Sequence, residues 1–113
     1  MKIAFTVSDG ADMSARMDSR FGRAAKFLIY DTETKAFSVI DNAYAQAGQG
    51  AGLKAAETVV KAGAVVLVTG DCGPKAFQAL KNAGVKVYSA KDVSVAGALE
   101  AFNEAKLAEI ASA

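Results

Sequence analysis

The stretch from Thr69 to Phe77 reads T-G-D-C-G-P-K-A-F and contains the only cysteine of the chain. Cys72 stands just before Pro74, a residue favoured in the first turn of a helix. A thiol beside a helix N-terminus can have a lowered pKa and can react or bind metal as a thiolate. The flanking glycines leave two other interpretations open, an anion site made of backbone amides and an ordinary strand-to-helix turn.

Histidine is absent from the 113 residues, and Cys72 is the only thiol. Protein sites for zinc, copper(II) and non-haem iron normally draw on imidazole or on several thiolates. A single thiolate is a poor anchor for a metal that does not bring its own ligands. We therefore predict no metal-ligating residue, and histidine-dependent acid–base catalysis is excluded as well.

A second glycine-rich stretch, A-G-Q-G-A-G, covers residues 47–52 and precedes a segment with helical spacing. Its glycines Gly48, Gly50 and Gly52 would expose several amides at the positive end of that helix. The stretch is neither a dinucleotide fingerprint, because Leu53 stands where the third glycine would be, nor a P-loop, because no G-K-[ST] follows. The alternative is a flexible loop that simply precedes a helix.

Positive side chains surround a third stretch, S-R-F-G-R, at residues 19–23. Two guanidinium groups, on Arg20 and Arg23, beside exposed amides would suit a multivalent, weakly hydrated anion. Phe21 between them would be a hydrophobic plug that holds the loop in place. The alternative is a solvated loop of mixed charge.

The overall composition describes a balanced chain with no strong charge. Thirteen basic and twelve acidic residues give a net charge of +1, which points to neither nucleic acid nor a membrane surface as a partner. The hydrophobic share is 52% and no signal peptide or membrane span is recognisable. We predict one domain over residues 1–113, in a cytoplasmic protein.

Periodicity and turn residues predict an α/β fold of order βββαβαβα. The strands are expected at 2–7, 26–30, 36–40, 64–69 and 85–88. The helices are expected at 51–62, from Pro74 to about 83, and after a cap at Asp92 or Ser94. Asp71 is a possible cap of the second helix. The first three strands predict a meander, and the complete sheet is mixed and five-stranded with helices on its faces.

Ligands of open α/β sheets bind beyond the carboxyl ends of the parallel strands. The loop after the first strand, the glycine stretch 47–52 and the turn 69–74 each fit that position. We therefore expect the three stretches to meet at one edge of the sheet.

Taken together, these motifs resemble the dinitrogenase iron–molybdenum cofactor biosynthesis family, which includes NifX-type carriers and the C-terminal domain of NifB-type proteins. The matching stretches are K-I-A-F-T-V-S-D-G, S-R-F-G-R-A with F-L-I-Y-D, A-G-Q-G-A-G, T-G-D-C-G-P-K-A-F, G-V-K-V-Y and V-A-G-A-L-E-A-F. They follow the order of the family and cover nearly the whole chain.

The resemblance implies a ribonuclease H-like fold that binds metal–sulfur clusters or their precursors and is not an enzyme. Single-domain members of this length, the orange proteins of sulfate-reducing bacteria, carry a molybdenum–copper sulfide cluster without covalent protein ligands. Many family members have histidine where this chain has Arg20, which favours charge recognition over ligation here. The implied cargo is a molybdenum–copper sulfide cluster, or alternatively an iron–molybdenum–sulfur precursor.

Carried over to this chain, the resemblance implies one set of cluster-binding residues. They are Arg20, Phe21, Gly22, Arg23, Gly48, Gly50, Gly52, Gly70, Cys72, Gly73 and Pro74. A partner protein that receives or delivers the cluster is implied, and the chain itself would be a monomer or weak dimer. Two other functions remain open: a nuclease-like Mg²⁺ enzyme using Asp9 and Asp71, and a phosphate- or nucleotide-binding regulator.

Overall fold

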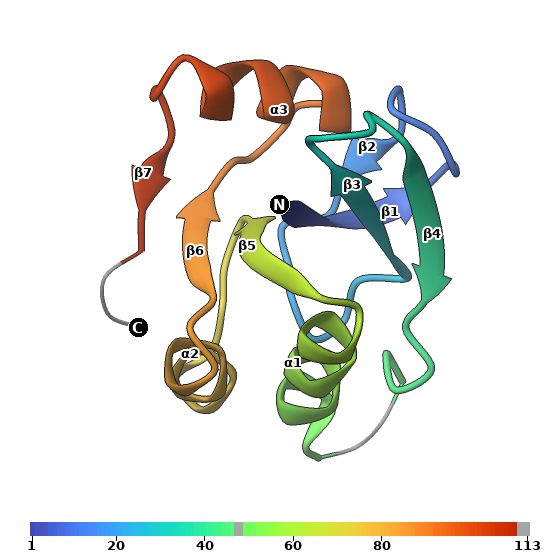
Figure 1. Cartoon of the computed structure of the whole chain (residues 1–113). Coiled ribbons are helices and arrows are strands. Elements are labelled where there is room, and N and C mark those ends of the chain that lie inside the picture. Colours follow the sequence, from blue (N-terminus) through green and yellow to red (C-terminus); the bar gives the residue numbers. More distant parts are fainter. Residues whose placement is uncertain (47–48, 111–113) are drawn as a thin grey trace.

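The computed structural model describes residues 1–46 and 49–110, which fold into three layers with a sheet between helices (Figure 1). The strands are β1 (Lys2–Asp9), β2 (Arg16–Met17), β3 (Lys26–Asp31), β4 (Phe37–Asp41), β5 (Ala64–Thr69), β6 (Lys86–Ser89) and β7 (Ala108–Glu109). The helices are α1 (Ala51–Lys61), α2 (Pro74–Asn82) and α3 (Val95–Asn103).

The sheet is mixed and has the order β4-β3-β1-β5-β6-β7, and β2 pairs with the C-terminal end of β1. The meander β1-β3-β4 is antiparallel, as predicted, whereas β5 runs parallel to both β1 and β6. The predicted number of five strands is wrong, because the described residues form seven. The two additional strands, β2 and β7, have two residues each and carry no hydrophobic alternation from which they could be recognised.

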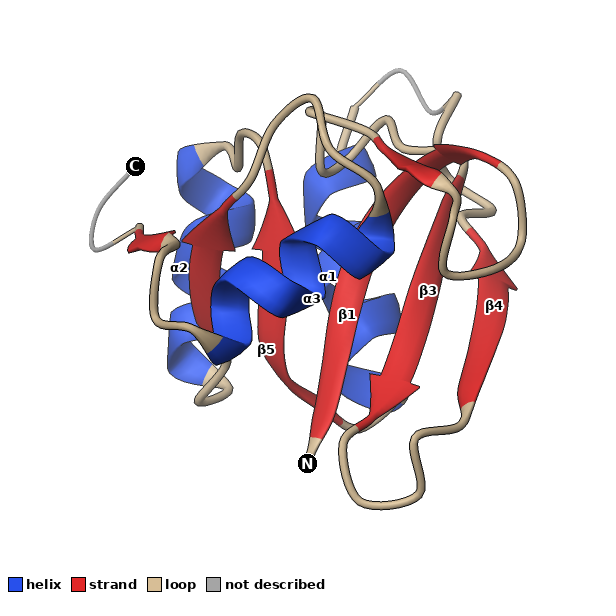
Figure 2. Cartoon of the chain, turned by 90° about the horizontal axis from the view of Figure 1, so that it is seen from above, coloured by secondary structure: helices blue, strands red, loops and turns tan. Residues whose placement is uncertain are grey.

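Two hydrophobic clusters fill the space on the two faces of the sheet. Helices α1 and α2 cover one face and α3 covers the other (Figure 2). Strand β1 contributes to both clusters, with Ala4 on the α1/α2 side and Phe5 on the α3 side. The apolar run of β5 is likewise divided between the faces, as expected for a strand covered on both sides.

Helix boundaries follow local signals in the sequence. Gly63 and Gly84 come just after the C-caps of α1 and α2 and have φ angles of +85° and +82°. That left-handed conformation is the usual role of a C′ glycine. At the start of α3, the Ser94 hydroxyl accepts a hydrogen bond from the Gly97 amide at 3.1 Å, so Ser94 and not Asp92 is the cap.

Parallel pairing brings the carboxyl ends of β1 and β5 to the same edge of the sheet. Phe5 lies opposite Val68, so the loop after β1 and the turn after β5 leave side by side. Helices α1 and α2 both lead into strands that run in this direction, and their N-termini lie at the same edge (Figures 1 and 2). The edge where we expected a site is therefore formed by two helix N-termini and two loops.

Candidate functional site

The loop after β1 is hydrogen-bonded directly to the turn after β5. The Asp71 amide donates to the Ser19 carbonyl at 2.6 Å, and the Phe21 amide donates to the Asp71 carbonyl at 3.1 Å. Gly70 makes this approach possible, because a Cβ there would lie 2.6 Å from the Cα and the carbonyl oxygen of Ser19. The S-R-F-G-R stretch and the T-G-D-C-G-P turn thus form one surface.

A buried polar network supports this pairing from below. The Thr6 hydroxyl donates to the Asp18 carbonyl at 2.7 Å and lies 3.0 Å from the Thr69 hydroxyl. The Asp18 amide returns a bond to the Thr6 carbonyl at 2.9 Å. Because both threonines are fully buried, these hydrogen bonds compensate for the removal of polar groups from water and fix the position of the loop.

Phe21 is the plug that the sequence predicts. Its side chain is 2% exposed, and its ring centroid lies 5.7 Å from that of Phe27 in the cluster under α1 and α2. Gly22 follows it and packs against α1, where a Cβ would come within 3.0 Å of the Gly52 nitrogen. The buried Asn42 side chain donates to the carbonyls of Gly22 and Ala24 at 3.1 and 2.9 Å, which fastens the loop from the other side.

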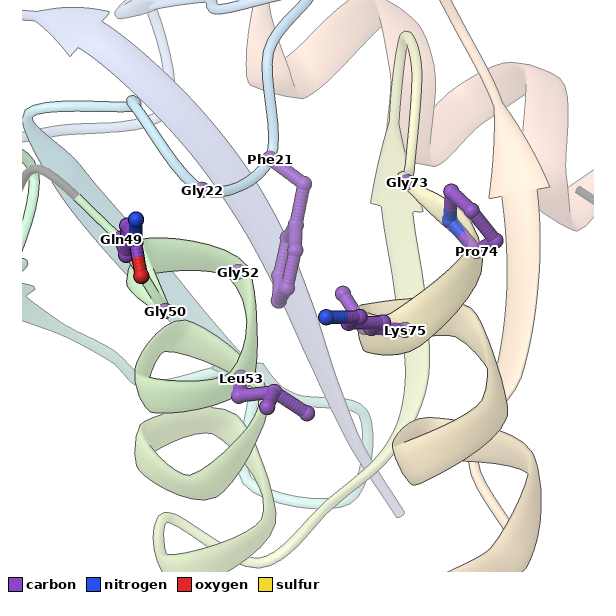
Figure 3. Close-up of a pocket in the computed structure, with 10 residues that line it drawn as sticks. Phe21, Gly22, Gln49, Gly50, Gly52, Leu53, Gly73, Pro74 and Lys75 are labelled. Atoms are coloured by element: carbon purple, nitrogen blue, oxygen red, sulfur yellow. The ribbon is translucent and has the colours of Figure 1, made fainter.

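An open groove of about 560 Å³ lies between the N-termini of α1 and α2 (Figure 3). We call it the N-terminal groove. Its lining residues come from the loop after β1, from the start of α1 and from the start of α2. They are Phe21, Gly22, Gln49, Gly50, Gly52, Leu53, Gly73, Pro74, Lys75 and Ala76.

Both helices begin at this groove without a side-chain cap in the part of the chain that the structure describes. The first intrahelical bonds are donated by the Lys54 amide to the Gly50 carbonyl and by the Phe77 amide to the Gly73 carbonyl. The amides that precede these two donors have no intrahelical acceptor. Pro74 lacks an N–H, so α2 contributes fewer donors than α1.

The suggested cap of α2 by Asp71 is wrong. The N-cap of α2 is Gly73, and the Asp71 carboxylate instead forms an ion pair with the Lys91 ammonium at 3.2 Å. An acidic cap would have partly neutralised the positive end of the helix. Its absence at this position leaves the α2 terminus available to an anion.

The glycines at the groove differ in what requires them. Gly52 allows α1 and α2 to approach, since its Cβ would be 3.2 Å from that of Ala76. Gly50 has a φ of +76°, a left-handed conformation that glycine adopts without strain. Gly73 has an ordinary φ of −66°, and an added Cβ would meet no atom within 4 Å. The fold therefore does not require glycine at position 73.

The three cations near the groove are placed differently. Arg20 binds Asp18 through Nε and Nη2, both at 3.2 Å, and its amide binds the same carboxylate at 2.9 Å. Arg23 donates from Nη1 to the Ala45 carbonyl at 3.0 Å. Neither guanidinium group is among the groove-lining residues, whereas Lys75 extends from the start of α2 at the groove (Figure 3).

Cys72 is half-buried against the cluster under α1 and α2. Burial raises the pKa of its thiol to about 11, opposite to the lowered pKa that its position beside a helix N-terminus allowed. The side chain is therefore a protonated thiol at neutral pH, because desolvation disfavours the thiolate. A raised pKa argues against the thiolate interpretation of Cys72 that the sequence left open.

The predicted meeting of three stretches at one edge is confirmed for the described residues. Six of the predicted residues line the groove: Phe21, Gly22, Gly50, Gly52, Gly73 and Pro74. Four lie beside it without being among the lining residues, namely Arg20, Arg23, Gly70 and Cys72. Gly48 lies outside the described residues.

Sequence reasoning missed several residues that build or line this site. Leu53 and Gln49 line the groove, and Lys75, noticed only as a nearby charge, does as well. The sequence around Asn42 showed only a polar loop. Its side-chain hydrogen bonds go to residues that precede it by 20 and 18 positions, and these contacts form only in the folded chain.

Two searches over the described residues bear on other functions. Within residues 1–46 and 49–110, no three His, Cys, Asp or Glu side chains come together in a way that could hold a metal ion. Over the same residues, none of the helices has the length and apolar character needed to cross a bilayer.

Comparisons with known proteins agree with the motifs. Residues 1–105 match the family described as dinitrogenase iron-molybdenum cofactor. An uncharacterized protein of Methanocaldococcus jannaschii is 30% identical over 110 residues, which are 95% of this chain and 89% of that protein.

Two solved structures are similar in sequence as well as in fold. The apo form of the orange protein from Desulfovibrio gigas has 40% identity and a TM-score of 0.94, covering 98% of this chain and 93% of the other. An NMR structure of a Thermotoga protein of the DUF35 family, described as NifB-like, has 36% identity and a TM-score of 0.86, covering 99% and 95%. The chain belongs to the dinitrogenase iron–molybdenum cofactor family.

Proposed function

We propose that this protein binds an anionic metal–sulfide cluster in the N-terminal groove and stores or delivers it without catalysing a reaction. One observation carries the proposal: two helices, for which no side-chain cap is found in the described part of the chain, open onto the same groove beside a buried aromatic plug. Family membership supports a role connected with the iron–molybdenum cofactor. The cluster is cargo, and its metals keep their own sulfide ligands.

The chemistry of the groove suits a soft anion better than a strongly hydrated one. Each helix N-terminus carries roughly half a positive charge, and the Lys75 ammonium adds a full charge beside them. Leu53 is the exposed apolar residue of this groove, and the buried Phe21 and Ala76 lie behind it; such apolar surface cannot replace the water shell of a phosphate ion. A sulfide-covered cluster, which is large, polarisable and weakly hydrated, can contact amides and apolar walls together.

We assign different roles to the two arginines and to Cys72. The Arg20 guanidinium is already hydrogen-bonded to the Asp18 carboxylate, and the Arg23 guanidinium donates to a main-chain carbonyl. We therefore propose that the two arginines hold the loop in place and contribute mainly positive charge at the rim of the groove. Because the Cys72 thiol stays protonated at neutral pH, we assign it no bond to the metal. Lys75 is the cation that we expect to contact the cargo directly.

The test is uptake of a defined cluster by the purified chain. The apo protein is incubated with tetrathiomolybdate and copper, desalted, and analysed for visible absorption and for molybdenum and copper content. A stoichiometric chromophore that survives desalting supports the proposal, and complete loss of metal contradicts it. Parallel incubations with phosphate and AMP test the regulator alternative, which predicts that these ions displace the chromophore.

Charge variants sharpen this experiment. Lys75→Ala should weaken uptake at least about tenfold, the loss of one charge-assisted contact. Lys81→Ala removes the same charge from the other end of α2, outside the groove, and should change uptake less than about twofold, since exposed charges at that distance are screened. Equal losses in both variants would mean that only net charge matters.

Other parts of the proposal follow from the cargo role. We propose that residues 1–113 act as one cytoplasmic cluster-binding domain, as a monomer or weak dimer, with a partner protein that supplies or receives the cluster. No observation favours the nuclease alternative, since Asp71 is paired with Lys91 and the described residues contain no cluster of three acidic side chains suited to a metal. Mg²⁺-dependent cleavage of nucleic acid that is lost in Asp71→Asn would revive it.

A further inference from the structure

The sheet ends in two edge strands that differ in length. Strand β7 has two residues, whereas β4 has five and pairs only with β3 in the described chain. Figure 2 shows β4 at the margin of the sheet, with no helix or strand beyond it. Natural proteins protect long edge strands with proline, lysine or a bulge. Strand β4 contains no proline or lysine, and its register with β3 has no bulge.

The main-chain hydrogen bonds of β4 alternate between its two sides. The Asp31 amide donates to the Ala36 carbonyl at 2.9 Å, and the Asn42 amide donates to the Ala25 carbonyl at 3.0 Å. These two bonds flank the ladder, so the even-numbered residues of β4 bond to β3 and the odd-numbered residues turn their N–H and C=O groups outward. The open side of β4 thus carries main-chain donors and acceptors that nothing in the described chain pairs with.

Apolar side chains accompany this open edge. Phe37 is 42% exposed, and Val39 is partly buried against the cluster under α3. Alternation places both on the α3 face of the sheet, where α3 crosses β1 and β5 and leaves β4 uncovered (Figure 2). On β3, Tyr30 stands opposite Phe37 and Leu28 opposite Val39. Apolar rows therefore run across the sheet to its open edge and stop there.

We propose that β4 pairs with β4 of a second copy of this chain, antiparallel and with the twofold axis between the two Ser38 residues. The sheets of both copies then become continuous. The outward groups of the two strands meet only when odd-numbered residues lie opposite odd-numbered ones, and this register fulfils that condition. Phe37 lies opposite the partner's Val39, so the apolar rows continue across the junction.

Charged residues at the ends of the strand select this register. Asp41 comes near the partner's Lys35, and opposite charges favour such a cross-strand pair. With Val39 on the axis, Phe37 would lie opposite the partner's Asp41. With Phe37 on the axis, Val39 would lie opposite the partner's Lys35. Both shifts place an apolar side chain against a charged one, so the edge is complementary to itself in one register, which favours a second copy over an unrelated strand.

Strand directions determine where the cargo sites lie in such a dimer. Strand β4 runs parallel to β1, because both are antiparallel to β3. The partner's β4 runs the opposite way, so the two N-terminal grooves lie at opposite ends of the continuous sheet. Each copy then holds its own cargo, and pairing needs no cluster. A contact between two short strands is small and suits a weak dimer. The inference names the surface of the weak dimer in the proposed function but does not depend on the cargo.

Disulfide trapping tests the register. Ser38→Cys in a Cys72→Ser background places one exposed cysteine at the axis, and the variant is oxidised mildly at high protein concentration. Residues that face each other there have Cα atoms about 4.5 Å apart, within reach of a disulfide, so we expect a covalent dimer. Asp41→Cys in the same background is the matched control on the same exposed edge. Its two copies would be six residues out of register, about 20 Å apart, and should form at least about tenfold less dimer.

Two charge substitutions test the contact without cross-linking. Phe37→Lys and Val65→Lys each change an exposed apolar residue of a strand, with 42% and 45% exposure, but only the first lies on β4. In sedimentation experiments over a range of concentrations, Phe37→Lys should raise the dissociation constant of the dimer at least about tenfold, because lysine opposes edge pairing and two apolar pairs are lost. Val65→Lys should change it less than about twofold. Circular dichroism of both variants checks that the fold is intact.

A peptide of residues 35–41 tests whether the edge selects its own sequence. In ¹H–¹⁵N NMR spectra we expect it to shift the outward amides of Phe37 and Val39 at least about tenfold more strongly than a scrambled peptide does. Equal binding of the two peptides would mean that the edge accepts any strand, and would overturn the inference. Equal disulfide formation by the two cysteine variants, or a parent chain that stays monomeric up to NMR concentrations, would also overturn it. None of these measurements uses the cargo, so this inference and the proposed cluster uptake can fail separately.

Discussion

Replacement of Gly73 by alanine separates the requirements of the fold from those of the cargo. The N-cap of α2 has φ −66° and ψ 160°, which alanine adopts without strain. Among the described residues, and apart from its two chain neighbours, the new methyl group meets no atom within 4 Å. Alanine at an N-cap costs about 0.5–1 kcal/mol relative to glycine. Alanine also lowers the conformational entropy of the unfolded chain relative to glycine, which stabilises the folded state by about 0.4–1 kcal/mol. The net change in the free energy of unfolding should therefore be within about 0.5 kcal/mol.

Cluster uptake should respond quite differently to the same substitution. The methyl group occupies space at the wall of the N-terminal groove, and one badly placed methyl group weakens binding by about tenfold or more. The assay is titration of the apo variant with preformed molybdenum–copper sulfide cluster, followed by the visible absorption after desalting. Urea unfolding of the same samples measures stability.

Gly84→Ala is the matched control, because Gly84 also has open space around its missing Cβ but lies at the other end of α2. Its φ of +82° makes alanine cost about 1–2 kcal/mol of unfolding free energy, while uptake by the folded fraction should be unchanged. The reasoning is refuted if Gly73→Ala binds the cluster as well as the parent chain does, or if both variants lose uptake equally.

Three further substitutions or titrations test other parts of the site. Alkylation of Cys72 by iodoacetamide should accelerate only as pH approaches about 11 in the folded chain, because burial raises the thiol pKa; in urea the rise should come near pH 8.5. Thr6→Val should lower the unfolding free energy by about 1–3 kcal/mol by leaving a buried carbonyl without its donor, whereas Thr58→Val, on the surface of α1, should change it by less than about 0.5 kcal/mol. Asn42→Ala removes two donors to carbonyls in residues 22–24 and should cost about 2–4 kcal/mol in urea unfolding and also reduce cluster uptake.

Elements with strong local signals could be predicted from the sequence almost to the residue. Pro74 opens α2, Gly63 and Gly84 follow α1 and α2, and the apolar run Ala64–Thr69 is β5 as expected. Strands β2 and β7 could not be predicted, because two residues carry no periodicity and their pairing with β1 and β6 depends on the assembled sheet. Tertiary contacts alone make them strands.

The site could be predicted as a meeting of stretches but not as an arrangement of charges. Motif positions beyond strand ends were sufficient to place Phe21 and Gly73 at one edge. The motif around Arg20 predicted a guanidinium group that suits an anion, whereas in the fold this group is hydrogen-bonded to the buried Asp18 carboxylate. Whether two such side chains pair depends on their exact positions in the folded chain, and the spacing of residues in the sequence does not give these positions.

The glycines of the candidate site show most directly which residues the fold itself requires. From the sequence, Gly48, Gly50 and Gly52 were predicted to expose amides to an anion, and the glycines of all three stretches entered one set of candidate cluster-binding residues. In the structure, Gly22, Gly52 and Gly70 are needed for close packing of one backbone or helix on another. Gly50 is needed for its left-handed φ. Among the described glycines of these stretches, Gly73 alone has neither requirement. Glycine is favoured over alanine at an N-cap, and Gly73→Ala measures how much more than this preference the proposed cargo demands at the start of α2.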